Sequence, residues 1–239
     1  MGEPRPPPDP VNLRYVAKLA RKDWLKNLQT AYFKHRVALL HARTKSHFVR
    51  YFGVASRNVH FIEQSARALL DEAIVEAAEA ELAARLDASM REIDRDTARA
   101  QAVLQAEGVT ALPEYVQAPL ELEAKCTSPK LTRYLELIVK ADRLMTLLEA
   151  LRLAGVLGTH AYDRQVAIAV RRLVAVPRSA LQVAVRLRKC LPLPNDASAA
   201  GAPAKSASAP ASNAPDVPEV TVAAADDGKT AFAHGTAGT

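Results

Sequence analysis

The sequence predicts a mainly α-helical protein, a helical bundle followed by a disordered C-terminal tail. Hydrophobic residues make up 49% of the chain but aromatic residues only 5%, and this composition favours packed helices over a sandwich or a barrel. Apolar residues recur at intervals of three and four along most of residues 10–191, which is the period of an amphipathic helix. One short N-terminal stretch, residues 36–44, also fits a strand.

Charge is segregated into three blocks along the chain. Residues 11–67 carry twelve Lys and Arg against two acids, and residues 68–123 carry thirteen acids against four Arg. Residues 124–191 again carry thirteen bases against four acids. Such segregation indicates separate surfaces. The two basic blocks could lie together, or one of them could pair with the acidic block of the same chain or of another chain.

The cysteines and the N-terminus favour a cytoplasmic location. Cys126 and Cys190 lie far apart and have no metal-ligand neighbours, which fits a reduced compartment better than a disulfide framework. The opening MGEPRPPPDP has no apolar core of the kind that a secretory signal needs. No apolar run approaches the length of a membrane span, so we expect no membrane partner.

Residues 1–9 are expected to be a flexible lead, and the first helix is predicted to begin at Asp9 and Pro10. Asp is a favoured N-cap, and Pro is favoured at the first helical position because it has no N–H to leave unpaired. The apolar positions that follow at threes and fours are Leu13, Val16, Ala20, Trp24 and Leu28.

Residues 34–57 form a basic stretch that contains no acidic residue. Aromatic and histidine side chains stand among its Lys and Arg residues. Phosphate contacts supply most of the affinity of proteins for nucleic acid, so such a stretch suits a polyanion-binding surface. The alternative is a solvated helix face whose charges maintain solubility.

Several local signals divide this stretch into short elements. Residues 36–44 fit either the end of the first helix or a strand with Val37, Leu39, His41 and Arg43 on one face. Thr44 is a candidate N-cap for the next helix, and Gly53 interrupts the pattern. Ser56 then offers an N-cap for a further helix, whose exposed N–H groups could hold a phosphate.

This order of elements resembles a ribbon-helix-helix DNA-binding unit over residues 35–70. The wider region 34–190 resembles the AcaB-type transcriptional regulators of integrating conjugative elements. The residues that carry the resemblance are RVALLHARTKSHFVRYFGVASRNVHFIEQ, LIVKADRLMTLLEALRLAGVL and YDRQVA. The resemblance implies that strands of two protomers pair in the DNA major groove and that the second helix begins at the DNA backbone.

The resemblance also implies roles for individual residues. His41 and Arg43 would read bases, and Arg is the side chain whose fork matches guanine. The remaining residues would contact phosphates: Arg36, Lys45, Arg50, Ser56 and Arg57.

Two helical regions are predicted, residues 10–110 and residues 111–191. In the first, a helical pattern runs from Arg57 to Glu107, either as one long arm or with a break. In the second, residues 120–125 fit a short extended segment, and Ser128 with Pro129 starts a strongly apolar helix. A short link around Gly155 and Gly158 leads to another helix that begins at Thr159, so the two are predicted antiparallel neighbours. Pro177 is expected to kink or restart the last helix.

Residues 192–239 are rich in proline, alanine, serine and glycine. Such a segment cannot bury enough apolar surface to offset the entropy of ordering the chain. We therefore expect a disordered tail.

The chain lacks the motifs of an enzyme. It contains no phosphate-binding glycine loop, no nucleophile elbow, no His-Glu-x-x-His helix and no Cys-x-x-Cys pair. His35, His41 and His47 stand six residues apart, which does not place them on one helical face as metal ligands at i and i+4 would be. We expect no catalytic residue, no metal and no cofactor.

The sequence leads to two functional hypotheses. The first is a homodimeric, sequence-specific regulator of transcription on a mobile genetic element, which binds double-stranded DNA through residues 36–57. Its downstream helices would build the dimer or contact RNA polymerase. The alternative is a non-enzymatic helical scaffold or accessory subunit of a conjugation or DNA-processing assembly.

Overall fold

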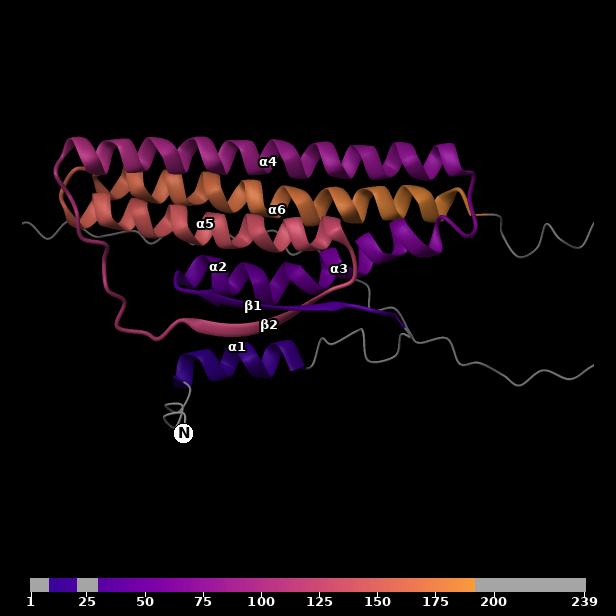
Figure 1. Cartoon of the computed structure of the whole chain (residues 1–239), viewed down its shortest axis with the longest axis horizontal. Coiled ribbons are helices and arrows are strands. Elements are labelled where there is room, and N and C mark those ends of the chain that lie inside the picture. The colour runs from indigo at the N-terminus through magenta and orange to yellow at the C-terminus, as the bar shows by residue number, and fades with distance from the viewer. Residues whose placement is uncertain (1–8, 21–29, 192–239) are drawn as a thin grey trace, which may run out of the picture. The chain divides into compact units, whose positions relative to one another are not determined.

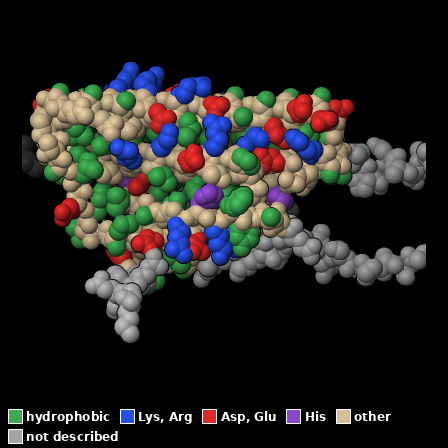
Figure 2. Space-filling view, viewed as in Figure 1, with side chains coloured by type: hydrophobic (Ala, Val, Ile, Leu, Met, Phe, Trp, Pro, Cys, Tyr) green, Lys and Arg blue, Asp and Glu red, His purple; other side chains and the backbone are tan. Residues whose placement is uncertain are grey.

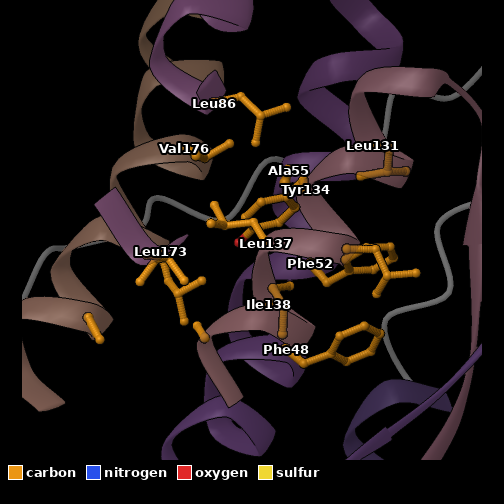
Figure 3. Packing of buried hydrophobic residues seen from close by; sticks show 14 of the residues in the cluster. Phe48, Phe52, Ala55, Leu86, Leu131, Tyr134, Leu137, Ile138, Leu173 and Val176 are labelled. Carbon is orange, nitrogen blue, oxygen red and sulfur yellow. The ribbon is translucent and has the colours of Figure 1, made fainter. Parts of the chain in front are cut away.

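Three long helices pack against one another, with the remaining elements on one side of them (Figure 1). They are α4 (Glu72–Ala106), α5 (Pro129–Leu153) and α6 (Thr159–Lys189). The structure is a computed structural model, and it describes residues 9–20 and 30–191. Each helix contributes buried side chains to one hydrophobic core, among them Leu86, Ile138 and Leu173 (Figure 3). The predicted mainly helical fold is confirmed.

A helical rod lies against α5 and α6 and supplies the aromatic side of the core. The rod comprises α2 (Ala42–His47), η2 (Phe48–Phe52), α3 (Gly53–His60) and η3 (Phe61–Ser65), and the η segments are π-helical. Phe48 and Phe52 stack with ring centroids 4.6 Å apart and point into the core (Figure 3). The backbone at Gly53 stays helical (φ −64°, ψ −33°), so the predicted interruption at this glycine is wrong. Residues before and after Gly53 are buried in the core, and their packing keeps the rod helical at this glycine.

Two strands form an antiparallel ribbon. β1 (Phe33–Leu39) pairs with β2 (Leu120–Cys126) in a register that places Phe33 opposite Cys126 and Leu39 opposite Leu120. Leu39 is buried and Val37 packs against the core, whereas the alternate residues Arg36 and Ala38 are exposed. This alternation confirms a strand in the N-terminal stretch and the extended segment at 120–125. The strand ends at Leu39, however, and does not reach Thr44 as the alternation suggested.

A single carboxylate explains why the strand stops there. Asp142 of α5 accepts hydrogen bonds from the backbone N–H groups of Leu40 and His41, each at 2.9 Å, and from the hydroxyl of Thr44. The chain turns at this carboxylate, and α2 begins with His41 as its N-cap rather than Thr44. Consequently His41 and Arg43 do not share a strand face.

The helical pattern from Arg57 to Glu107 is broken, because the rod ends at Ser65 and α4 begins after Asp71. The Asp71 carboxylate caps α4 by accepting from the N–H of Ala73 at 2.9 Å. The turn brings the rod back toward α4, with which η3 makes contact. The predicted regions 10–110 and 111–191 therefore contribute to the same core. All described residues belong to one unit that spans residues 1–193.

The C-terminal hairpin follows its sequence signals, except that α6 does not restart at Pro177. Ser128 caps α5 by accepting from the N–H of Leu131 at 3.3 Å, and Gly155 (φ +74°) ends it in the left-handed conformation. α6 begins at Thr159 and runs through Pro177 without a break. The residues around Pro177 are buried against the neighbouring helices, and this packing offsets the cost of an interior proline.

Helix α1 (Pro10–Ala20) begins as predicted, with the Asp9 carboxylate accepting from the N–H of Val11 at 2.8 Å. The buried face of α1 differs from the one that the apolar pattern predicted. Asn12 is buried, while Leu13 and Val16 are about half exposed. The predicted continuation through Trp24 and Leu28 lies outside the described residues. No helix in the described part of the chain is long and apolar enough to cross a membrane.

Most carboxylates of α4, which belong to the acidic block of the sequence, pair with bases of the same chain. Carboxylates of α4 form ion pairs with bases of both neighbouring helices, and Figure 2 shows acidic and basic side chains interleaved along this part of the surface. The interhelical pairs are Glu79 with Lys130, Asp87 with Arg133, Asp94 with Lys140, Glu81 with Arg186, and Glu92 and Asp96 with Arg172. These contacts answer the question that the sequence left open, since α4 meets the C-terminal basic block of its own chain.

Candidate nucleic-acid interface

Three arginines line the solvent side of the rod. Arg43, Arg50 and Arg57 are exposed and stand seven residues apart. At 1.5 Å per residue, neighbouring members are roughly 10 Å apart along the rod. None of the three forms an ion pair with a carboxylate of the described chain. We call these three residues the rod arginines.

The rod arginines continue into a further base at the end of α6. The Arg188 guanidinium lies over the Phe61 ring, 4.2 Å from its centroid. Burial, and then the positive charge of Arg57, lower the pKa of Arg188. Two guanidinium groups therefore repel each other at this end of the rod, and an anion placed between them would relieve that repulsion. Arg57 and Arg188 stand 131 residues apart in the sequence, so this junction became visible only in the fold.

The strand contributes less positive charge than expected. Lys34 and Arg36 are exposed on the outward face of the ribbon, where Lys34 lies opposite Lys125. Arg36, with 89% of its side chain exposed, forms an ion pair with the opposing Glu123 at 3.4 Å. Arg36 is thus accessible to a ligand, but its charge is partly compensated.

His41 is not available to read a base. Its side chain is 9% exposed, its Nδ1 accepts a hydrogen bond from the N–H of Arg43 at 3.1 Å, and its Nε2 lies 3.2 Å from the hydroxyl of Tyr162. Burial lowers the pKa of His41, which favours the neutral ring in this position. The predicted base-reading role of His41 is therefore wrong for this conformation, because the ring caps a helix inside the protein.

Lys45 and Ser56 also point inward. The Lys45 side chain is 1% exposed, and its Nζ donates to Asn12 Oδ1 at 3.3 Å and to the carbonyl oxygen of Ala118 at 3.0 Å. Burial lowers the pKa of this ammonium group. Ser56 is 1% exposed, and no helix begins there, so it has no free N–H groups to offer a phosphate. The predicted phosphate contacts of Lys45 and Ser56 are therefore wrong, because both side chains are buried.

A helical pattern in the sequence could have separated the two groups. Lys45 and His41 stand three and seven residues before Phe48 and so share its inward side, whereas Arg43 and Arg50 lie on the opposite side. Interpreting residues 36–44 as one strand hid this relation. Of the seven predicted residues, the structure leaves Arg36 and the three rod arginines on the surface.

The described residues offer little for other kinds of site. No group of three His, Cys, Asp or Glu residues among them could hold a metal ion. The tightest polar cluster, around Asp142 and His41, joins the rod to α5 and α6 by hydrogen bonds within the protein. The exposed rod arginines are therefore the strongest candidate interface.

Comparison with known proteins supports the fold. No protein-family model matches the sequence, and no curated protein matches it. The structure is similar to the crystal structure of selenomethionine-containing AcaB from uropathogenic E. coli, with a TM-score of 0.64 and 19% sequence identity. The similarity covers 68% of this chain and 83% of that chain. The chain has an AcaB-like fold.

Proposed function

We propose that the protein is a non-enzymatic regulator that binds double-stranded DNA through the rod arginines. The observation that carries the proposal is the charge balance of the surface. The acids of α4 pair with bases of α5 and α6, whereas Arg43, Arg50 and Arg57 remain exposed without a carboxylate partner among the described residues. An unpaired, regularly spaced row of arginines is suited to the phosphates of a duplex.

The three arginines have different parts in this proposal. Arg43 lies in the first turn of α2, and the first turn of a helix is the part that recognition helices commonly present to base edges. It is our candidate for reading guanine through a bidentate contact. Arg50 and Arg57 lie further along the rod and would position the protein on the backbone, as phosphate contacts do.

We also propose a homodimer. β1 pairs with β2 along one edge, and the ribbon has two strands in the part of the chain that the structure describes. Pairing of two copies through the second edge of β1 would be symmetric, since the same residues would face each other. Two rods would then be related by a twofold axis, as the halves of a palindromic operator are. A regulator of a mobile genetic element is the role that we propose for this dimer.

The experiment is a selection of preferred duplexes from a random pool, followed by anisotropy titrations over a range of salt concentrations. The test variant is R43A/R50A/R57A, and the control R91A/R99A/R143A removes three exposed arginines from α4 and α5. Loss of the two phosphate contacts of Arg50 and Arg57 lowers the slope of log affinity against log salt by roughly two. Arg43→Ala alone is expected to lose about 1–3 kcal/mol of discrimination at one base pair.

The outcomes separate the regulator from the scaffold. A wild-type protein that selects one duplex, and a test variant that loses it while the control keeps it, support the regulator. Binding that is blind to sequence and equally weakened in both variants would favour a helical scaffold. Absence of binding to any duplex at low ionic strength would exclude the proposed function.

A further inference from the structure

The solvent face of α6 carries a second row of arginines. Arg164, Arg171 and Arg178 are exposed and, like the rod arginines, stand seven residues apart. Seven residues make almost two full turns of an α-helix, so the three side chains lie along one side of it. We call them the α6 arginines.

The α6 arginines differ from the other bases of the same helix. Arg172 forms ion pairs with Glu92, at 2.6 Å, and with Asp96, and only 16% of its side chain is exposed. Arg186 pairs with Glu81 at 2.5 Å. These two residues fasten α6 to α4. The α6 arginines have no ion pair with any carboxylate of the described chain, and helix packing does not account for them.

A shallow groove between α4 and α6 adds one more arginine to this face. Its walls bring Arg85 of α4 and Arg171 of α6 to the same hollow, whose only acidic side chain is Glu92. The remaining lining is mostly small: Ala88, Ser89, Ile168, Arg172 and Ala175. Because Glu92 already pairs with Arg172, an anion in the groove would meet the free guanidinium groups of Arg85 and Arg171.

The dimensions of this row fit a linear polyanion. From Arg164 to Arg178 the helix extends about 21 Å at 1.5 Å per residue. Duplex DNA rises about 3.4 Å per nucleotide of each strand, so this length corresponds to roughly six phosphates of one strand. The lining of the groove, with Ala88, Ser89 and Ala175, leaves little apolar area for a protein partner.

Helix α6 itself lies beside the proposed DNA-binding element. The rod packs along α6, with His41 next to Tyr162 at one end and Arg57 near Arg188 at the other. The rod and α6 therefore run parallel, and each carries its own row of exposed arginines.

We propose that the α6 arginines, with Arg85 across the groove, form a second surface that binds the phosphate backbone of nucleic acid without reading its sequence. It would extend the contact with DNA beyond the site that the rod selects. The proposal takes its ligand class from the proposed function, but it assigns a different surface.

The test compares four proteins on the selected duplex and on a scrambled duplex of equal length. They are the wild type, R164A/R171A/R178A, R164K/R171K/R178K and the control R91A/R99A/R143A. Substituting an exposed arginine away from packed sites usually changes the free energy of unfolding by no more than about 0.5 kcal/mol. Circular dichroism with urea unfolding checks that each variant is folded.

We expect the alanine variant to lose affinity for both duplexes by the same factor, with the salt slope reduced by roughly two to three. The preference for the selected duplex should not change, and the lysine variant should retain the slope, because lysine also neutralises a phosphate. The inference is overturned if the alanine variant binds both duplexes like the wild type, or weakens no more than the control. It is also overturned if the variant keeps its DNA affinity and loses binding only to poly-glutamate.

A failure of this inference can be told apart from a failure of the proposed function. If R43A/R50A/R57A loses the selected duplex while the α6 variant is unaffected, the rod proposal stands and the α6 surface is rejected. If the α6 variant weakens all duplexes while the rod variant does not change selection, the α6 surface stands and the rod proposal is rejected.

Discussion

Replacing Asp142 by alanine should strongly destabilise the fold. Its carboxylate accepts hydrogen bonds from the N–H groups of Leu40 and His41, each at 2.9 Å. Through these two bonds, α5 holds the end of β1 and the start of the rod. Leaving a buried donor without an acceptor costs about 1–3 kcal/mol, so two such donors give roughly 2–6 kcal/mol. The Thr44 hydroxyl keeps its second acceptor, the carbonyl oxygen of His41 at 2.7 Å, and adds less. We expect a loss of about 4 kcal/mol for Asp142→Ala. Asp142→Asn should lose about half as much, because the amide retains one acceptor oxygen.

Urea unfolding followed by circular dichroism measures this loss. Glu136→Ala, an exposed change on the same helix, is the control and should stay within about 0.5 kcal/mol of the wild type. Asp142→Ala should also expose the start of the rod, so that trypsin cleaves after Arg43 faster than in the wild type. A decrease below about 1 kcal/mol, or one no larger than that of the control, would falsify the view that this carboxylate anchors the rod.

Three further predictions concern other buried charges and rings. Burial lowers the pKa of His47 from 6.5 to about 4, so below pH 6.5 the unfolded chain takes up a proton that the folded one does not. The free energy of unfolding should therefore fall as the pH drops from 6.5 to 4, by up to about 3 kcal/mol. His47→Gln should flatten this dependence in urea titrations, and an unchanged curve would rule out His47 as its source. Lys45→Met should leave the salt slope of DNA binding unchanged because the ammonium group is internal, whereas a decrease of about one would place Lys45 on the DNA. Arg172→Ala should cost about 2–3 kcal/mol and Arg186→Ala less than about 1 kcal/mol in chemical unfolding, since only the second pair is well exposed; equal losses would contradict this ranking.

The local elements were largely predictable because their signals are local. Asp9 and Ser128 cap helices through N–H groups two and three residues away, and the Gly155 conformation ends α5 beside it. The alternation of residues 120–125 predicted β2 for the same reason. Helix periodicity and these caps depend on a few neighbouring residues, which a single sequence displays in full.

The candidate site was only partly predictable, because burial decides it and burial depends on distant residues. Arg43, Arg50 and Arg57 were identified from charge alone, and they are exposed. Lys45 has the same charge, but its ammonium group meets the carbonyl oxygen of Ala118, which lies 73 residues away in sequence. A sequence does not show whether a basic side chain points into the core or toward solvent. Buried and exposed bases therefore look alike until the chain is folded.

By itself, the sequence determined the helical class, the starts of α1, α5 and α6, and the presence of an acid-free basic stretch. The tertiary structure decided where the strand stops, through a carboxylate 101 residues from His41. It also decided which charges cancel, because the acids of α4 meet the bases of α5 and α6 only when the three helices pack together. Periodicity and capping act between near neighbours, whereas hydrogen bonds and ion pairs between distant segments depend on how the whole chain is arranged in space.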